Sequence, residues 1–207
     1  MRGTGTAVRQ FLVVLDDALP FASAVLPWVL AVFAVAAVVR TRWCGVSPAL
    51  AVGASFVDAA LVHSSLLITY LIALPQPDSG TALRWALGTD LLEAVRAAPG
   101  DLWPWLQLLG NLGLIFPLGA LLPLRVRWLT PSRMIALGAL AVTCTIEIAQ
   151  CTVIAGRVAS ADDIALNTTG AVFGGLFSRR WCGELCGLPR VPQVAGESAR
   201  RRPAVSR

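Results

Sequence analysis

The sequence predicts an all-α membrane protein, a polytopic transmembrane helix bundle of about five spans. Hydrophobic residues make up 56% of the 207-residue chain and charged residues only 14%, which differs strongly from the composition of a soluble globular domain. Several apolar runs also reach the roughly 20 residues that a helix needs to cross the hydrocarbon layer. Both observations place the chain in a bilayer.

Five apolar segments are the predicted spans. They are Pro20 to Val39, Ala49 to Leu74, Leu102 to Leu122, Met134 to Ile154, and Ala161 to Phe177. The last segment is short, so spanning would require Arg179, Arg180 and Trp181 to reach back to the interface, or a locally thinner bilayer. The chain divides into residues 1–101 with two helices and a loop, 102–178 with a three-helix core, and a basic tail at 179–207 that we expect to be disordered.

The longest connection between spans, Pro75 to Asp101, contains a second kind of pattern. Leu83, Leu87, Leu91 and Val95 recur at helical spacing, with charged residues between them, which predicts a short amphipathic helix. Such a helix can lie on the membrane surface with a tryptophan as anchor, or it can cap the bundle. The sequence leaves both arrangements open.

All 17 basic residues are arginines, and their distribution predicts the orientation. With five spans, twelve fall on one side: Arg40, Arg42, Arg125, Arg127, Arg133, Arg179, Arg180, Arg190, Arg200, Arg201, Arg202 and Arg207. Five fall on the other: Arg2, Arg9, Arg84, Arg96 and Arg157. Excess arginine marks the cytoplasmic side, so we predict a cytoplasmic C-terminus and an outside N-terminus. Since the arginines act as topology determinants and as a lipid-facing tail, no nucleic-acid partner is expected.

The sequence predicts no metal, cofactor or catalytic residue. Cys182 and Cys186 are close enough to begin a metal site, but no second pair and no neighbouring histidine completes it. No serine–histidine pair and no HExxH pattern is present either.

Polar residues gather where the fourth and fifth predicted spans meet. Glu147 and Gln150 lie one turn apart on the fourth span, Asp163 and Asn167 share a face of the fifth, and Arg157 lies in the turn between them. Glu147 and Asn167 each lie roughly 10 Å from the end of their helix and so share a depth. Charged groups persist inside membranes mainly where they pair, bind a ligand or line a cavity. We therefore expect Glu147, Arg157 and Asp163 to form one network.

Other spans contribute to the predicted pocket. Asn111 lies roughly 13 Å into the third span, close to the depth of Glu147, and Pro117 predicts a kink just after it. On the second span, Asp58 and His63 are candidates to extend the pocket. Gly170 and Gly174 form a small-xxx-small pattern, which lets another helix approach closely and offers a face for an oligomer.

These residues resemble the VanZ-like membrane proteins. One helix carries the pattern N-x4-F-P-x-G as Asn111, Phe116, Pro117 and Gly119. The pattern E-x2-Q-x6-R-x5-D-x3-N-x2-G follows as Glu147, Gln150, Arg157, Asp163, Asn167 and Gly170. The resemblance covers about Leu106 to Leu176. The turn Ala159-Ser160-Ala161 departs from the bulky apolar residue and acid expected there, and the usual Pro-Phe segment before the third span is missing. The resemblance implies a cell-envelope protein of a type linked to glycopeptide antibiotic resistance, without an established biochemical activity.

Three functions fit this pattern. We expect an outward-facing pocket of Asn111, Glu147, Gln150, Arg157, Asp163 and Asn167 to bind a polar group of a cell-wall precursor, a lipid or a glycopeptide. The first alternative is an intramembrane enzyme or transporter acting on an envelope lipid, with Glu147 and Asp163 as acid and base and Arg157 on a phosphate or carboxylate. The second alternative is a polar network that only fixes the register of the helices.

Overall fold

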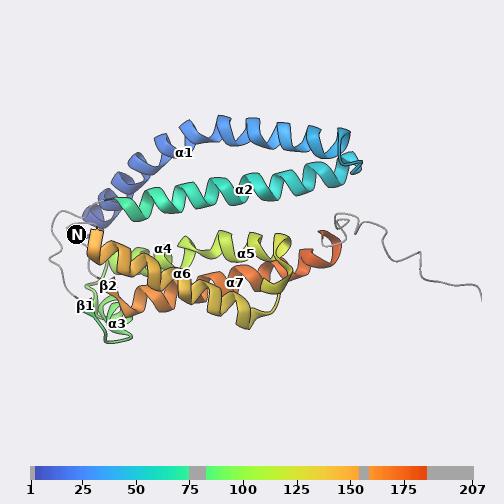
Figure 1. The fold of residues 1–207 in the computed structure, drawn as a ribbon. Helices are drawn as coiled ribbons and strands as arrows, with labels where there is room; N and C mark the ends of the chain where they lie inside the picture. Colours follow the sequence, from blue (N-terminus) through green and yellow to red (C-terminus); the bar gives the residue numbers. More distant parts are fainter. Residues whose placement is uncertain (1–2, 75–82, 154–158, 186–207) are drawn as a thin grey trace, which may run out of the picture.

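The computed structural model describes residues 3–74, 83–153 and 159–185, and in these ranges the chain is almost entirely helical (Figure 1). The elements are α1 (Gly3–Arg42), α2 (Pro48–Ala73), β1 (Leu83–Arg84), α3 (Thr89–Arg96), α4 (Trp103–Leu114), α5 (Phe116–Arg125), the 3-10 turn η1 (Arg127–Leu129), α6 (Ser132–Val153), β2 (Ala159–Ser160) and α7 (Ala161–Leu185). The predicted all-α fold class is confirmed.

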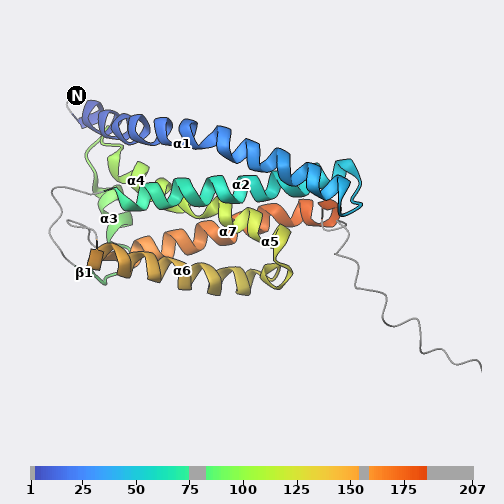
Figure 2. The same cartoon turned by 45° about the horizontal axis from the view of Figure 1, so that its top comes forward.

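The long helices run side by side between two ends of the bundle (Figures 1 and 2). One end carries β1, β2 and α3 and is called the strand end. The other, called the arginine end, carries the residues Arg40, Arg42, Arg125, Arg127, Arg133 and Arg179 at helix ends and in η1. The N-terminal end of α1 lies at the strand end and the C-terminal end of α7 at the arginine end. Arg84 and Arg96 lie at the strand end, so within the described residues these arginines separate along the bundle as the sequence predicts.

Four helical segments are long and apolar enough to cross a membrane: Asp16–Arg42, Pro48–Ala73, Trp103–Arg125 and Ser132–Thr152. The predicted fifth span is not confirmed. Its segment forms α7, which runs the length of the bundle and packs against α4, α5 and α6. A helix shielded by three others can keep polar residues that a lipid-facing span could not.

The third predicted span breaks where a proline predicts a kink. Helix α4 ends at Leu114, and α5 begins at Phe116 with Pro117 in its first turn. Ile115 between them has φ −94° and ψ −5°, which interrupts regular helical geometry. Because Pro117 has no N–H, it cannot continue the hydrogen bonding of α4, and its fixed φ suits a helix start. The predicted kink is confirmed.

Glycines allow α7 to approach α4 and α5 backbone to backbone. A Cβ on Gly170 would lie 1.8 Å from the carbonyl oxygen of Leu112, and one on Gly174 would lie 2.2 Å from that of Phe116. From the opposite side, a Cβ on Gly119 would lie 2.1 Å from the carbonyl oxygen of Ala171. No side chain fits at these distances. The glycine face is thus occupied within the chain, and the suggested oligomer through Gly170 and Gly174 stays a prediction.

The apolar core lies in the middle of the same contact. It consists of Ile68, Ile115, Ile135, Ala139 and Ala171, which come from α2, the α4–α5 break, α6 and α7. Since α7 contributes a small residue here, the larger isoleucines of three neighbours can close around it. This core packs α2, α6 and α7 around the α4–α5 break.

Asp58 does not extend the predicted pocket, which corrects the sequence interpretation. Its carboxylate pairs with the guanidinium groups of Arg40 and Arg125, and Arg40 also donates to the Ser55 hydroxyl. These groups lie at the arginine end, because Asp58 lies 15 residues, or roughly 22 Å, before the last residue of α2. The pairing joins α1, α2 and α5, so Arg125 is not an unpaired surface arginine. The Nδ1 atom of His63 is buried without a hydrogen-bond partner in the part of the chain that the structure describes.

The amphipathic helix is shorter than its sequence pattern. Leu83 and Arg84 form β1, which pairs in parallel with Ala159 and Ser160 of β2, and α3 begins only at Thr89. The backbone of Gly88 has φ +85°, a left-handed conformation that ends the preceding loop and that glycine adopts without strain. The predicted helix therefore began too early, because Leu83 fits the helical spacing although it lies in β1.

Candidate functional site

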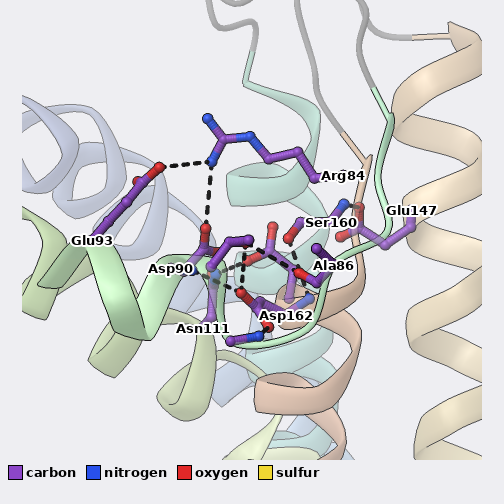
Figure 3. A network of polar contacts seen from close by, with 11 residues as sticks. Arg84, Ala86, Asp90, Glu93, Asn111, Glu147, Ser160 and Asp162 are labelled. Carbon is purple, nitrogen blue, oxygen red and sulfur yellow. Dashed lines mark hydrogen bonds and ion pairs between the residues drawn. The ribbon is translucent and has the colours of Figure 1, made fainter. Parts of the chain in front are cut away.

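At the strand end, Asp162 holds the first turn of α3. One carboxylate oxygen accepts the Gly88 N–H at 2.6 Å, and the other accepts the Asp90 N–H at 2.8 Å and the Thr89 hydroxyl at 3.0 Å (Figure 3). The first N–H groups of a helix have no partners within it, and Gly88 at the N-cap has no side chain to serve them. A carboxylate from another helix supplies the cap, and its charge suits the positive end of the helix.

Two further hydrogen bonds connect Asp162 to α6 through Ser160 and Glu147. The Ser160 hydroxyl accepts the Asp162 N–H at 3.2 Å and so caps α7, which begins at the next residue. The Ser160 N–H in turn donates to Glu147 Oε2 at 3.1 Å. A continuous series of hydrogen bonds therefore connects α6, β2, α7 and α3 (Figure 3). Ser160 and Asp162 are both buried, which keeps these bonds away from competing water.

Asn111 and Asp163 join the third predicted span to α7. The side-chain amide of Asn111 donates to Asp163 Oδ1. This contact joins α4 to the first turn of α7, although the residue counts place Asn111 deeper than Asp163, at the level of Glu147. One glycine contact joins the same two helices, since Gly170 of α7 meets the carbonyl of Leu112, the residue after Asn111 on α4, and lets the two backbones approach closely.

Gln150 and Asn167 are buried at the same end of the bundle. Gln150 Nε2 donates to the Ile72 carbonyl at 3.3 Å and so satisfies one of the last carbonyls of α2, which have no partner within that helix. Asn167 is only 4% exposed, and its Oδ1 atom has no hydrogen-bond partner among residues 3–74, 83–153 and 159–185. A buried amide oxygen without a donor costs about 1–3 kcal/mol.

The electrostatics of the site centre on two neighbouring carboxylates. Burial raises the pKa of Asp90 above its ordinary value, and the adjacent charge of Asp162 raises it further. Arg84, whose Nη1 lies 3.5 Å from Asp90 Oδ1, opposes this shift, and Glu93 adds to it. Arg84 also lies 3.6 Å from Glu93, so one guanidinium bridges the loop and α3 (Figure 3).

The structure thus unites most, but not all, of the predicted site. It places Asn111, Glu147, Gln150, Asp163 and Asn167 at one end of the bundle. Arg157 lies outside the described residues, so the expected network of Glu147, Arg157 and Asp163 stays a prediction. We call the set Asn111, Glu147, Gln150, Ser160, Asp162, Asp163 and Asn167 the polar cluster.

Sequence reasoning missed Ser160 and Asp162, the residues with the most informative contacts. No sequence pattern singled out Asp162, and Ser160 stood out only as a departure from the family pattern. The available signal was local: a serine two residues before an acid at a helix start is typical of an N-cap. The partner of Asp162, a helix start more than 70 residues away, left no trace in the spacing.

The chemistry of the polar cluster is that of hydrogen bonding. It offers carboxylates and amides, which can accept and donate to hydroxyl, amide and ammonium groups of a ligand. Within the described ranges no group of three or more His, Cys, Asp and Glu side chains is arranged to hold a metal ion.

The fold and this site define a polytopic α-helical membrane protein with a hydrogen-bonded polar cluster at one end of its bundle. The VanZ/LLP1 family model matches residues 61–182, more than half of the chain, and the protein belongs to this family. The match takes in α3 and the second half of α2, besides the stretch from Leu106 to Leu176 that carries the sequence resemblance. Comparison with curated proteins gives no significant match, and neither does comparison with solved structures.

Proposed function

We propose that this VanZ/LLP1 family protein acts in the cell envelope by binding a polar group of a cell-wall precursor, a lipid or a glycopeptide at its polar cluster. The binding residues are Asn111, Glu147, Gln150, Arg157, Asp163 and Asn167, and no bond is made or broken. Glycopeptide antibiotic resistance, to which the family resemblance points, is the expected cellular effect.

The observation that carries this proposal is the buried Oδ1 atom of Asn167. A leucine of similar size would avoid the cost of desolvating an amide, so an asparagine at this position needs a compensating role. A hydrogen-bond donor on a ligand, such as a hydroxyl or an amide N–H, would supply it. Glu147 and Gln150 lie at the same end and are equally buried, so the ligand group would meet several polar atoms at once.

The helix-packing function is the second candidate, and specific contacts favour it. Asp162 caps α3, Ser160 caps α7, and Asn111 bonds Asp163, so these side chains already have structural partners. A network of this kind fixes register without any ligand. The two functions differ in what they require of Asn167. Replacing it by an apolar residue should stabilise the packed helices, whereas it should weaken the binding of a ligand.

The test compares Asn167→Leu with Thr169→Val, a matched change at an exposed position on the same helix. Thermal unfolding of each purified protein in detergent is measured alone, with a glycopeptide antibiotic, and with a lipid-linked cell-wall precursor. A ligand that binds the folded state raises the unfolding temperature. We expect one of the two compounds to stabilise the wild type and Thr169→Val, but not Asn167→Leu.

Cells that carry Asn167→Leu, Glu147→Gln or the control Thr169→Val give the physiological readout. Asn167→Leu and Glu147→Gln should reduce survival in the presence of the glycopeptide while the protein level stays unchanged. If Asn167→Leu unfolds at a higher temperature and supports full survival, the helix-packing function is correct and the binding function is wrong.

We further propose that the strand end faces the outside and the C-terminus the cytoplasm. The support is the positive-inside rule applied to the arginine end, where α1, α5, α6 and α7 present their arginines. A cysteine introduced by Gly80→Cys should react with an impermeant maleimide on intact cells. Reaction only after permeabilisation would reverse the orientation.

A further inference from the structure

Helix α3 leaves its large apolar side chains exposed, unlike a helix of a soluble domain. Its inward residues are Asp90, 7% exposed, and Ala94. Its apolar residues point outward, since Leu91 is 52% and Val95 64% exposed. A helix normally turns its apolar face to the protein and its polar face away.

The hydrogen bonds of its first turn fix α3 in this orientation. Asp162 accepts the backbone N–H groups of Gly88 and Asp90, and Arg84 lies within ion-pair distance of the Asp90 carboxylate. Rolling α3 by half a turn to bury Leu91 and Val95 would expose Asp90 and break its contact with Arg84. The outward apolar face is therefore built into the fold.

Apolar exposure continues from α3 onto its neighbours. Trp85 and Leu87 in the loop before α3 are both more than 70% exposed. Helix α4, against which α3 packs, presents Trp105 and Leu109 to the outside, and Leu102 just before it is also exposed. Since α4 is the first part of a candidate membrane span, its outward side chains meet lipid. Helix α3 packs against α4 and therefore lies beside this span at the strand end.

We propose that α3 lies in the boundary between headgroups and acyl chains at the strand end, with Trp85, Leu91 and Val95 in contact with lipid. Tryptophans are enriched at this depth, and an amphipathic helix that lies in the interface inserts its apolar face by about 5–10 Å. The charged side chains of α3, Glu93 and Arg96, can reach the headgroups while the leucines contact acyl chains. A second copy of the chain is the rival occupant, and dilution of the protein in lipid distinguishes the two.

This position has a consequence for the polar cluster. Because Asp162 bonds directly to the first turn of α3, the depth of α3 sets the depth of Asp162. The polar cluster then lies just below headgroup level. This consequence holds whether or not the cluster binds a ligand.

The experiment measures the depth of single positions in the full-length protein. A small fluorescent amino acid is encoded at Val95, at Glu93 or at Leu109, and each variant is reconstituted in vesicles of phosphatidylethanolamine and phosphatidylglycerol. Brominated acyl chains then quench fluorophores that contact lipid. Leu109, exposed on α4, gives the signal of a lipid-facing position, and Glu93 gives that of the polar side of α3.

We expect bromolipid to quench position 95 at least half as strongly as position 109, and position 93 only weakly. Equal, weak quenching at 93 and 95 would overturn the proposal, since α3 would then lie in water. Weak quenching at 95 that strengthens when the protein is diluted in lipid would also overturn it, because a second copy would be covering the face. An unfolding temperature equal to that of the wild type shows that each labelled variant is folded.

Discussion

The carboxylate of Asp162 accepts the backbone N–H of Asp90 at 2.8 Å, although the two residues are 72 positions apart in the chain. This bond attaches α3, a helix outside the bundle, to the first turn of α7. Through Ser160 and Glu147 the same attachment reaches α6. The strand end is therefore a connected hydrogen-bonded unit.

Asp162→Ala should detach the first turn of α3. Three hydrogen bonds to a buried carboxylate are lost, and loss of a helix cap alone costs about 1–2 kcal/mol. Hydrogen exchange at the Gly88 and Asp90 amides should accelerate roughly 10-fold or more. Glu93→Ala is the control, because Glu93 is exposed and its ion pair with Arg84 is a surface pair. Equal exchange in both variants would contradict the capping role.

Asp90 should make the protein less stable as the pH rises. Burial and the neighbouring Asp162 raise the folded-state pKa of Asp90 above its ordinary value of 3.8, so the folded state holds this proton more tightly than the unfolded state. Stability from this group is present at pH below 3.8 and is lost as the pH rises through the folded-state pKa. Asp90→Asn should remove that loss and unfold at a higher temperature than the wild type at neutral pH. Thermal unfolding from pH 3.5 to 7 checks this, with Asp16→Asn, a change at an exposed acid on α1, as control. A lower unfolding temperature for Asp90→Asn would contradict it.

Gly170→Ala should destabilise the bundle, whereas Gly113→Ala should not. A methyl at position 170 would lie 1.8 Å from the Leu112 carbonyl oxygen, so α4 and α7 would have to separate at a cost of about 1–3 kcal/mol or more. A methyl at position 113 meets nothing within 4 Å, and alanine favours a helix over glycine by up to about 1 kcal/mol. Thermal unfolding of the two variants measures the difference. Similar unfolding temperatures would show that α4 and α7 are not in backbone contact.

Asp58→Asn should lower the free energy of unfolding more than Arg125→Gln does. The first change leaves Arg40 and Arg125 facing each other without a carboxylate, whereas the second leaves Arg40 paired with Asp58. The three groups are partly exposed, so the expected loss for Asp58→Asn is ~1–3 kcal/mol, between the values for surface and buried pairs. Chemical denaturation in mixed micelles would show the order. A larger loss for Arg125→Gln would mean that Asp58 is not the centre of the contact.

Sequence patterns predicted the helices, because apolar runs and their lengths are local properties. Pro117 predicted the break of the third span, and the glycine spacing on α7 predicted a close helix contact. The depth argument, which uses only the rise per residue, placed Asn111 level with Glu147 and did not predict its contact with Asp163. The mean polarity of α7 could not predict how far this helix is shielded from lipid, since the shielding depends on how completely α4, α5 and α6 surround it.

Contacts between distant segments were beyond the sequence patterns. Asp58 looked like a pocket residue because it shares a helix with His63, but its partners come from α1 and α5. Asp162 and Gly88 are both unremarkable in their local contexts, and only the packing of α3 on the bundle brings them together. Likewise, the leucines of α3 predicted an amphipathic helix but not which face the bundle would cover.

A cryo-electron microscopy structure of the protein in lipid nanodiscs, with and without the stabilising compound, tests the central claim most directly. The relevant region is the space next to Asn167 Oδ1. The account predicts a water-filled cavity there, open at the strand end, with density for a ligand group within hydrogen-bond distance of Asn167 when the compound is present. A dry interior in which Asn167, Glu147 and Gln150 bond only to one another and to the backbone would contradict it and leave helix packing as the function of the polar cluster.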